Sequence, residues 1–365
     1  MRRAPIALTM ALAAALAWGC QGDDAAFRTL VPDRVGTAEL PFDTRGLIAL
    51  LADETTACVS EDYEYRVHCF DRGGEVVGVF GGEGEGPGEF DMTNVLVGGH
   101  DGTVGVLDFG LNRFSVFEPS GALVTEMLLP GAAAADFIPV WRFGESVAGV
   151  AITTFDFALF ETGAGSGGFM SMFEIDIASG TVVRQEELPP VDAEIECEKV
   201  HYGFPGPGGG WVFTACGGHV VFVSPGGETT VVRAPTYTDE LPSERDIAAW
   251  TESRRARGRA GVGGEALEQF RNTPKEYHLS WSEKFDDQGR FWIATERDRD
   301  EFSWLDVYVP REGTFFASVR VHDRVLGFDV AGSTLAVLVE RTPTPDDPEG
   351  IPARAVDWYD IGGWR

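Results

Sequence analysis

The feature that most constrains the fold of this chain is an internal repeat. When the sequence is laid over itself with Ile48 on Val95, a shift of 47 positions, residues 48–80 align on residues 95–127 without a gap. Valine, arginine, phenylalanine and glycine recur at matched positions. Repeats of this length are typical of radial or solenoid arrays, in which each unit is one small antiparallel sheet.

Each unit of the repeat predicts four strands separated by turns. In the second unit the strands run over 95–99, 104–108, 113–118 and 122–128, and apolar residues alternate with polar ones where one face of a sheet would be buried. Later parts of the chain keep the same spacing of glycine turns and aromatic strands. The repeat therefore predicts an all-β fold, a six-bladed β-propeller of four-stranded antiparallel blades. The expected blades cover 44–80, 91–130, 137–190, 194–234, 275–320 and 324–365.

The glycine-rich stretch GGEGEGPGEF at 81–90 is predicted to join two blades. Its glycines weaken helix and strand alike, so it suits a close crossing from the outer edge of one sheet to the inner strand of the next. Phe90 is expected to wedge between the two sheets. Because an open ring would leave two strand edges exposed to aggregation, residues 27–35 are expected to add the missing outer strand beside 355–362.

The segment 81–124, GGEGEGPGEF…DGTVGVLDFGLNRFSVFEPSGALV, resembles an NHL-type repeat, and more closely the six-bladed β-propeller lipoproteins of bacteria. The resemblance is carried by these residues and is weaker elsewhere in the chain. It implies a propeller with its ligand site at the mouth of the central channel. Some proteins of this architecture are calcium-dependent lactonases and lyases that hold a metal in the channel.

The N-terminus has the layout of a secretory signal. Two arginines precede an apolar run over 4–18 that is short for a membrane span, and Gly-Cys follows it. Residues 17–20 resemble the lipobox of bacterial lipoproteins, which implies that Cys20 carries a lipid and that Gln21 directs the protein to the outer membrane. The alternative is an ordinary cleaved signal with an incidental cysteine.

These features divide the chain into three parts. Residues 1–19 are expected to be a lipoprotein signal peptide, 20–42 a lipid-anchored linker with the ring-closing strand, and 43–365 the propeller. No other segment is long and apolar enough to cross a bilayer. The expected location is the outer membrane, facing the periplasm or the cell surface.

Four cysteines lie beyond Cys20, an even number that suits disulfides in an exported protein. Facing residues of a hairpin share one sum of residue numbers. Glu61 and Arg66 flank the turn of the first repeat with a sum of 127, and Cys58 with Cys69 gives the same sum. Cys58 and Cys69 are therefore expected to face each other and form a disulfide.

A second disulfide is expected between Cys197 and Cys216, which bracket residues 204–210 almost symmetrically. A metal site is the alternative for the cysteines. No pair of them has the C-x-x-C spacing, and the six histidines are scattered along the chain, so disulfides are favoured.

Charged residues flank the same turn in both units of the repeat, Glu61 with Arg66 and Asp108 with Arg113. The favoured interpretation is an ion pair that braces the turn of each blade. A charged functional site is the alternative.

The net charge of −29 narrows the range of partners. A surface this acidic repels the phosphates of nucleic acids and anionic membrane faces, so binding of DNA, RNA or peripheral lipid is disfavoured. The charge keeps an exported protein soluble. The alternative is that the negative charge attracts a cationic or Ca²⁺-bearing partner.

Residues 235–274 break the strand pattern and predict a short helical insert between blades four and five. Ser243 is expected to cap a first helix, whose apolar face includes Ile247 and Trp250, and GGEALEQF predicts a second helix. The insert also holds the only basic concentration in the chain. Its four arginines are Arg254, Arg255, Arg257 and Arg259.

Because the insert replaces a connector from an outer strand to an inner strand, it is expected on the same face as 81–90, where the channel opens. Three interpretations of its arginines stay open. They hold the insert on the acidic propeller, they receive an anionic ligand or partner at the channel mouth, or they belong to a solvated loop. Arginine suits carboxylate and phosphate alike.

The candidate inner strands offer a few groups that could bind a ligand or a metal. These are Glu196, Glu198, His201, His278, Glu283 and Asp329. No repeated motif directs them to one point, and the chain lacks G-x-S-x-G, H-E-x-x-H and a phosphate loop. No catalytic residue or cofactor is therefore assigned.

The leading hypothesis is a monomeric, lipid-anchored binding module that takes a protein or small-molecule ligand on its channel-mouth face and does not bind nucleic acid. It would touch the membrane only through its lipid. A hydrolase or lyase with Ca²⁺ in the channel is the alternative.

Overall fold

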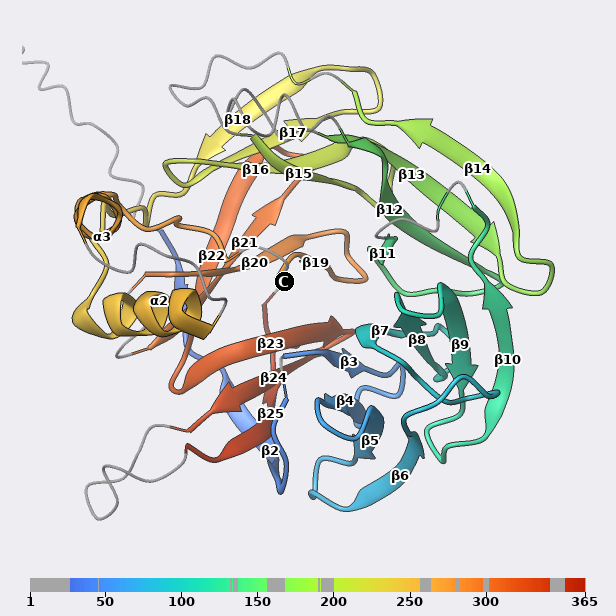
Figure 1. Ribbon diagram of the computed structural model, residues 1–365. Coiled ribbons are helices and arrows are strands. Elements are labelled where there is room, and N and C mark those ends of the chain that lie inside the picture. The colour runs from blue at the N-terminus through green and yellow to red at the C-terminus, as the bar shows by residue number, and fades with distance from the viewer. Residues whose placement is uncertain are drawn as a thin grey trace, which may run out of the picture.

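Six antiparallel sheets stand in a ring around a central axis in the computed structural model of the chain (Figure 1). The structure describes residues 27–44, 46–131, 133, 137–155, 168–189, 191, 200–256, 264–279, 282–297, 302–341 and 352–364. In each sheet the first strand lies nearest the axis, where first strands of neighbouring blades contact one another. The predicted six-bladed β-propeller of four-stranded blades is confirmed.

Blades one to three follow the repeat identified in the sequence. Blade one consists of β3 (Ile48–Leu50), β4 (Ala57–Glu61), β5 (Arg66–Phe70) and β6 (Val76–Gly81). Blade two consists of β7 (Thr93–Gly98), β8 (Val104–Asp108), β9 (Arg113–Phe117) and β10 (Leu123–Leu128). Blade three consists of β11 (Ile138–Pro139), β12 (Ser146–Phe155), β13 (Gly168–Asp176) and β14 (Thr181–Glu187).

Blades four to six complete the ring, with two N-terminal strands added to the last two blades. Blade four consists of β15 (Val200–Pro205), β16 (Trp211–Ala215), β17 (His219–Val223) and β18 (Thr229–Arg233). Blade five consists of β19 (Lys284–Phe285), β20 (Phe291–Thr295), β21 (Ser303–Val309) and β22 (Thr314–Val321), with β1 (Thr29–Leu30) at its outer edge. Blade six consists of β23 (Arg324–Ala331), β24 (Thr334–Glu340), β25 (Arg354–Asp360) and β2 (Asp33–Leu40).

The hydrophobic core is divided among the contacts between blades. The described buried side chains form six apolar clusters, and each cluster lies between one pair of adjacent blades. Second strands such as β8 and β16 are buried along their whole length, because both faces of the strand pack on a neighbouring blade. Blades six and one share such a cluster too, so the ring closes through an ordinary inter-blade core.

The N-terminal segment closes the ring beside the C-terminal strand as expected, but further along the chain. β2 pairs antiparallel with β25 as the outer strand of blade six, and it shares only residues 33–35 with the expected strand 27–35. Ala38 and Leu40 are buried in the seam between blades six and one and fix this register. A bulge between Arg34 and Gly36 interrupts the alternation that a sequence pattern would detect. β1 instead pairs parallel with β22 of blade five.

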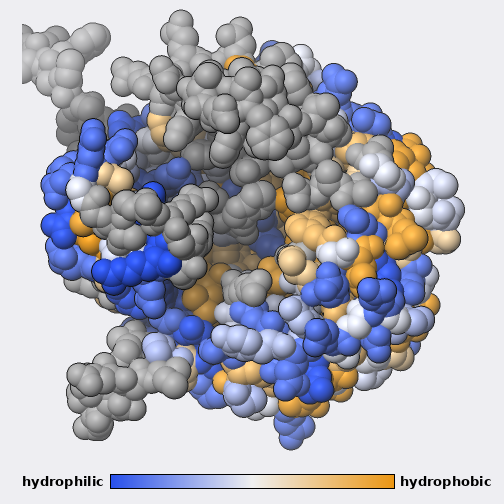
Figure 2. All heavy atoms as spheres, in the orientation of Figure 1, coloured by the Kyte–Doolittle hydropathy of each residue, from blue (hydrophilic) through white to orange (hydrophobic). Residues whose placement is uncertain are grey.

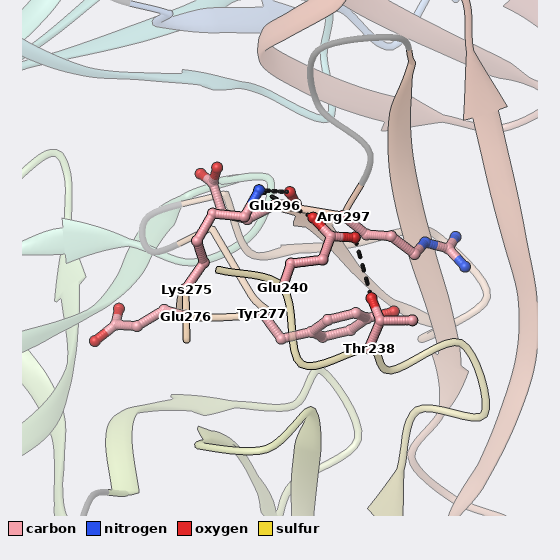
Figure 3. Close-up of a pocket in the computed structure, with 7 residues that line it drawn as sticks. All are labelled: Thr238, Glu240, Lys275, Glu276, Tyr277, Glu296 and Arg297. Carbon is pink, nitrogen blue, oxygen red and sulfur yellow. Dashed lines mark hydrogen bonds and ion pairs between the residues drawn. The ribbon is translucent and has the colours of Figure 1, made fainter. Parts of the chain in front are cut away.

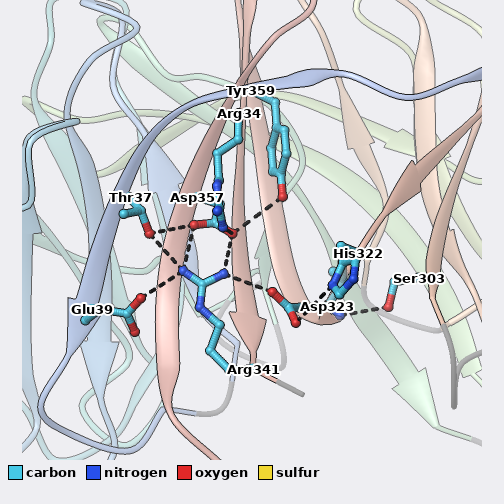
Figure 4. A network of polar contacts seen from close by, with 10 residues as sticks. Arg34, Thr37, Glu39, Ser303, His322, Asp323, Arg341, Asp357 and Tyr359 are labelled. Atoms are coloured by element: carbon cyan, nitrogen blue, oxygen red, sulfur yellow. Dashed lines mark hydrogen bonds and ion pairs between the residues drawn. The ribbon is translucent and has the colours of Figure 1, made fainter. Parts of the chain in front are cut away.

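A network of charged side chains ties the closing strand to the rest of blade six (Figure 4). The guanidinium of Arg341 lies 2.6 and 2.9 Å from the two carboxylate oxygens of the fully buried Asp357. Arg341 also contacts Glu39 and Asp323, at 3.0 and 2.9 Å. The hydroxyl of Thr37 donates to Asp357 at 2.6 Å. Arg341 thus contacts two residues of β2, Thr37 and Glu39. It also contacts Asp357 of β25 and Asp323, which lies between β22 of blade five and β23 of blade six.

The connector 81–90 has the role that its sequence predicts. Phe90 is fully buried between blades one and two, and its backbone N–H donates to the carbonyl of Gly82 at 2.8 Å. Gly81 has φ +90°, and a Cβ there would lie 2.4 Å from the ring of Phe90. Only glycine therefore allows the chain to cross this close to the wedge.

The turn-bracing ion pairs expected at the repeat were wrong. Asp108 and Arg113 face each other in the β8–β9 ladder, but both side chains turn to the connector. The Asp108 carboxylate accepts the backbone N–H of Asp91 at 2.7 Å, and Arg113 donates to the carbonyls of Glu85 and Glu89. Backbone groups of the glycine-rich connector need partners that the connector itself cannot supply, and the blade supplies them.

In blade one the corresponding pair is also separated. Arg66 forms its ion pair with Glu64 at 2.6 Å, and Glu61 contacts the imidazole of His68 at 2.8 Å. Both repeats thus place an arginine opposite an acidic residue of the preceding strand, Arg66 opposite Glu61 and Arg113 opposite Asp108. The two repeats do not use these residues for the same ion pair.

The disulfide Cys58–Cys69 is confirmed and joins facing residues of β4 and β5. Both cysteines are fully buried between blades one and two. Cys216 is also disulfide-bonded. Its expected partner Cys197 lies outside the described residues.

Removing the first disulfide should weaken the fold measurably. For Cys58→Ala with Cys69→Ala we expect the free energy of unfolding to fall by about 2–3 kcal/mol, because an 11-residue loop is no longer closed in the unfolded chain. Urea unfolding of the variant beside the oxidised protein measures this. A loss below about 1 kcal/mol would contradict the expected contribution.

The helical insert is present, with helices α2 (Glu244–Ala256) and α3 (Glu265–Asn272). Ser243 caps α2 as expected, since its hydroxyl accepts the N–H of Asp246 at 3.2 Å while the Asp246 carboxylate accepts the N–H of Ser243 at 2.9 Å. Neither α2 nor α3 has the length and apolar character that spanning a membrane requires, and the same holds for any other helix in the described ranges.

Candidate functional site

The two faces of the ring differ in the length of their connections. We call the face that carries the blade-to-blade connectors the top face, and the opposite one the bottom face. On the bottom face the strands are joined by short turns, the longest of which are 51–56 and 140–145. Some strand ends at the top are joined by short turns as well, but this face also carries much longer segments, of which the four longest are 156–167, 188–199, 234–283 and 341–353.

The axis is closed from below by one arginine. Arg142 comes from the bottom turn of blade three, and its guanidinium donates to the carbonyl of Val330 at 3.3 Å and lies 3.8 Å from the carboxylate of Asp329, both in blade six. It also lies 4.0 Å from Asp287 of blade five. A Cβ on Gly98 of blade two would come within 2.4 Å of this guanidinium. Arg142 therefore crosses the bottom of the channel, and access to the axis is left to the top face.

At the top face, the insert is rooted beside blade five, where a small pocket of about 10 Å³, with room for about one water molecule, opens to solvent (Figure 3). Lys275 occupies its centre. The Lys275 ammonium lies 3.0 Å from Glu240 and donates to the carbonyl of Glu296 at 3.0 Å. The pocket is lined by Thr238, Glu240, Lys275, Glu276, Tyr277, Glu296 and Arg297. Because Lys275 is already paired with Glu240 and donates to the carbonyl of Glu296, the pocket fixes the insert and leaves little room for a ligand.

Beneath this pocket, one buried carboxylate holds both ends of the insert. Asp306 in β21 accepts the hydroxyl of Thr236, which precedes α2, at 3.1 Å, and that of Tyr277, which follows α3, at 2.8 Å. Asp306 is fully buried, and burial raises the pKa of its carboxyl. Burial and the neighbouring Asp306 also raise the pKa of Tyr277. The two chain ends of the insert are thereby fixed at the same point of blade five.

Blades five and six share an arrangement that joins arginine to a buried aspartate through a hydroxyl. In blade five, Arg297 donates to Ser318 at 2.8 Å and Ser318 donates to Asp306 at 2.7 Å. In blade six, the same three positions are Arg341, Thr37 and Asp357, at 2.8 and 2.6 Å.

Sequence reasoning missed this arrangement, although a signal for it exists. The segments 295–308 and 339–359 each contain Glu-Arg at the end of the second strand and Asp-x-Tyr in the third. The hydroxyl partners, Ser318 and Thr37, lie in fourth strands that no local pattern connects to the motif.

The buried tyrosines make the fold sensitive to alkaline pH. Burial and Asp306 raise the pKa of Tyr308 well above its usual value. Between the unfolded-state pKa, about 10, and this higher value, the folded chain keeps a proton that the unfolded chain has lost. Stability should therefore fall as the pH rises through about 10, by roughly 1.4 kcal/mol per pH unit for each such tyrosine.

For Tyr308→Phe we expect a shallower fall in stability above pH 10, measured by urea unfolding at a series of pH values. Tyr63→Phe is the matched control, because Tyr63 is 79% exposed. If the stability of Tyr308→Phe fell above pH 10 as steeply as that of the unaltered protein, Tyr308 would not be the cause of this pH dependence.

Among the arginines of α2, Arg245 holds the insert on the propeller, whereas Arg254 and Arg255 do not. Arg245, at the start of α2, pairs with Glu340 of blade six at 3.2 Å. Arg254 lies over the ring of Trp250 at 4.8 Å, and Trp250 stacks on Phe270 of α3. Arg255 is exposed. Within the described ranges, neither Arg254 nor Arg255 forms an ion pair with the propeller, and Arg257 and Arg259 lie outside those ranges.

Helix α2 lies over the ring beside the central opening, with its end pointing inward (Figure 1). Figure 2 views the same face and shows a hydrophilic surface over this helix, at the border of a hollow centre. Among the described contacts, those of Arg245 and Lys275 hold the insert on the propeller, so the first interpretation of the arginine cluster, that it locks the insert to the propeller, is not favoured for Arg254 and Arg255.

The structure does not bring the predicted channel residues together. His278 is buried, with its Nε2 3.5 Å from the hydroxyl of Tyr308. Asp329 accepts the backbone N–H of Leu50 at 2.8 Å and so joins blades six and one. Glu283 is half-buried just before β19.

Of the remaining candidates, Glu196 and Glu198 lie outside the described residues, as does the side chain of His201 in β15. In the part of the chain that the structure describes, no three His, Cys, Asp or Glu side chains are grouped so that they could hold a metal ion.

Comparison with known proteins gives relatives in fold only. No family model and no curated protein matches the sequence. Similar solved structures include a Bacteroides fragilis protein whose description proposes that it is exported (9% identity, TM-score 0.44, 91% of this chain and 99% of that chain). Virginiamycin B lyase of Staphylococcus aureus matches at 11% identity and TM-score 0.40, over 89% of this chain and 88% of that chain.

A third similar structure is the β-propeller domain of Cps50 from Myceliophteria thermophila, at 10% identity and TM-score 0.42, over 90% of this chain and 99% of that chain. Similarities of this degree do not transfer a function. The number of blades is taken from the sheet topology of this chain itself.

Proposed function

We propose that this protein is a binding module outside the cytoplasm, held at the outer membrane by a lipid on Cys20, that receives its partner on the top face. The observation that carries the proposal is the restriction of all long connections to that face. Loops lengthen without cost to the core, and a rigid scaffold with long loops on one side presents that side for recognition. Closure of the bottom by Arg142 agrees with this polarity.

The group recognised on the partner is proposed to be a carboxylate or a phosphate. Arg254 and Arg255 lie at the inward end of α2 in a chain whose net charge is −29, and neither is neutralised by a described acidic residue of the propeller. A guanidinium that is already stacked on an aromatic ring loses little freedom when it binds an anion. Long polyanions such as nucleic acids would still be repelled by the rest of the surface, so the partner is a protein or a small molecule.

The described residues give no reason to prefer the alternative function, a hydrolase or lyase with Ca²⁺ in the channel, over this binding function. Thermal unfolding with and without added Ca²⁺ separates the two, because a metal bound to the folded chain raises the melting temperature. A rise in melting temperature with Ca²⁺ would replace the binding proposal.

The arginines can be tested by capture. We expect Arg254→Ala with Arg255→Ala to lower recovery of the co-purifying partner from detergent-extracted envelopes by roughly tenfold, because charge-assisted hydrogen bonds to the anion are lost. Unfolding free energy should change by at most about 1 kcal/mol, since the lost contacts are the stack on Trp250 and solvent. Quantitative mass spectrometry of the captured material gives the recovery.

Arg311→Ala is the matched control, an exposed arginine in a bottom turn of blade five. Its recovery should equal that of the unaltered protein. Equal loss in both variants would mean that general charge, and not the insert, governs capture.

A further inference from the structure

We infer that the outer edge of blades five and six rests on the lipid surface, so that the ring stands edge-on and its axis runs parallel to the membrane. This inference rests on the lipidation of Cys20 in the proposed function and adds the membrane-facing surface to it.

The chain is fixed to the outer edge of blade five from Arg28 onward. The backbone N–H of Ser318 in β22 donates to the carbonyl of Arg28 at 2.9 Å. Leu30 is buried in the core between blades five and six, in register with Val319 of β22. From this point the chain continues directly into β2, so the same segment belongs to blade six as well.

The tether between the lipid and this edge is short. Only residues 21–26 separate Cys20 from Phe27, the first residue that the structure describes. Seven Cα-to-Cα steps of fully extended chain span at most about 25 Å. The edge at which the chain enters the fold is therefore confined to within that distance of the lipid surface.

The surface at the tether has the chemistry of a lipid contact. Phe27, Val31 and Val35 are 40%, 61% and 44% exposed. Residues 27–36 carry two arginines and one aspartate, a local charge of +1 in a chain of −29. Aromatic and aliphatic side chains with flanking arginines are favoured at the boundary between water and lipid, whereas the acidic remainder of the surface is not.

A second apolar strip lies on the outer strands of blades two and three, across the ring from blades five and six, and the tether keeps it away from the membrane. Neighbouring strands lie about 4.8 Å apart, so two four-stranded blades on opposite sides of the axis span about 30 Å even without the channel. This exceeds the reach of the tether. Figure 2 shows the strip as hydrophobic residues along the rim opposite α2. Its exposed residues are Leu123, Val124, Leu128 and Val183.

Photo-crosslinking from the lipid tests the inference. The full-length lipidated protein is placed in vesicles of phosphatidylcholine and phosphatidylethanolamine that carry a diazirine on the phosphatidylethanolamine headgroup, and adducts are mapped by peptide mass spectrometry. We expect adducts on residues 27–35. Phe27→Ser with Val31→Ser and Val35→Ser should lower their yield roughly tenfold. Val124→Ser with Val183→Ser, on the opposite strip, should leave it unchanged.

The mass of the N-terminal peptide is measured first, so that the two possible failures are told apart. An unmodified Cys20 would remove the anchor from the proposed function and this inference with it. A lipid-modified Cys20 with adducts on 123–128, or with none on 27–35, would overturn the edge-on orientation and leave the anchor in place.

Discussion

Asp357→Ala is expected to lower the free energy of unfolding by about 3–5 kcal/mol, one of the two largest losses that we predict for a single residue. The carboxylate of Asp357 is fully buried and accepts from Arg341, Thr37 and Arg34, at 2.6 to 3.3 Å. Without it the guanidinium of Arg341 remains at the seam with its main partner missing. Glu39 and Asp323 remain beside Arg341, but neither is as close or as buried as Asp357, so losing this partner costs more than the intact network contributes.

The loss should concentrate on the ring closure, because the network joins β2 to β25. Hydrogen exchange of β2 is therefore expected to accelerate more than that of β8 in blade two, while urea unfolding gives the total. Asp33→Ala is the matched control, because Asp33 is an exposed aspartate of β2, the strand that the network attaches to β25. It should change the free energy of unfolding by less than about 0.5 kcal/mol. Equal losses in the two variants would show that the seam does not depend on the buried charge.

Phe90→Ala is expected to cost a similar amount, about 3–5 kcal/mol, through a cavity. The ring of Phe90 is fully buried between blades one and two and meets the ring of Phe117 edge to face, with centroids 5.9 Å apart. The connector that carries Phe90 cannot collapse into the gap, because Arg113 and Asp108 hold its backbone in place. Urea unfolding and differential scanning calorimetry both measure the loss.

A matched control for this cavity is Val124→Ala on the outer strand of blade two, where the side chain is 56% exposed. We expect a change within about 0.5 kcal/mol. If Phe90→Ala were equally mild, the connector would be free to repack and the wedge would have no structural role.

The architecture could be predicted from the sequence because its signals are local. The alternation of apolar residues in strands, the glycine turns and the 47-residue repeat all come from residues close together in sequence. The position of Cys58 opposite Cys69 follows from a single hairpin turn. The cap of α2 by Ser243 is likewise decided within four residues. These features need no knowledge of what packs against them.

The features that were missed depend on contacts across the ring. Arg142 reaches Val330, 188 residues away in sequence, and Thr37 reaches Asp357, 320 residues away. Side chains of this kind carry no periodic pattern, and their partners become neighbours only when the ring closes. The misplaced closing strand has a related cause, since the bulge beside Gly36 shifts the alternation on which strand prediction rests.

The candidate site was predicted only in its general position. The insert, its face and its basic character followed from the sequence, but the clustering of charges singled out Arg254 and Arg255 and not Arg245. The structure separates them, because Arg245 meets Glu340 and the other two meet an aromatic ring and solvent.

Photo-crosslinking from the two faces of the ring tests the central claim most directly. A photo-reactive phenylalanine is placed at Arg255 on the top face and, in a second protein, at Arg311 on the bottom face, and both membrane-anchored proteins are irradiated in intact envelopes. A covalent adduct with a second molecule at position 255 and none at position 311 is the result that a top-face binding module predicts. An adduct at position 311 with none at position 255 would contradict it.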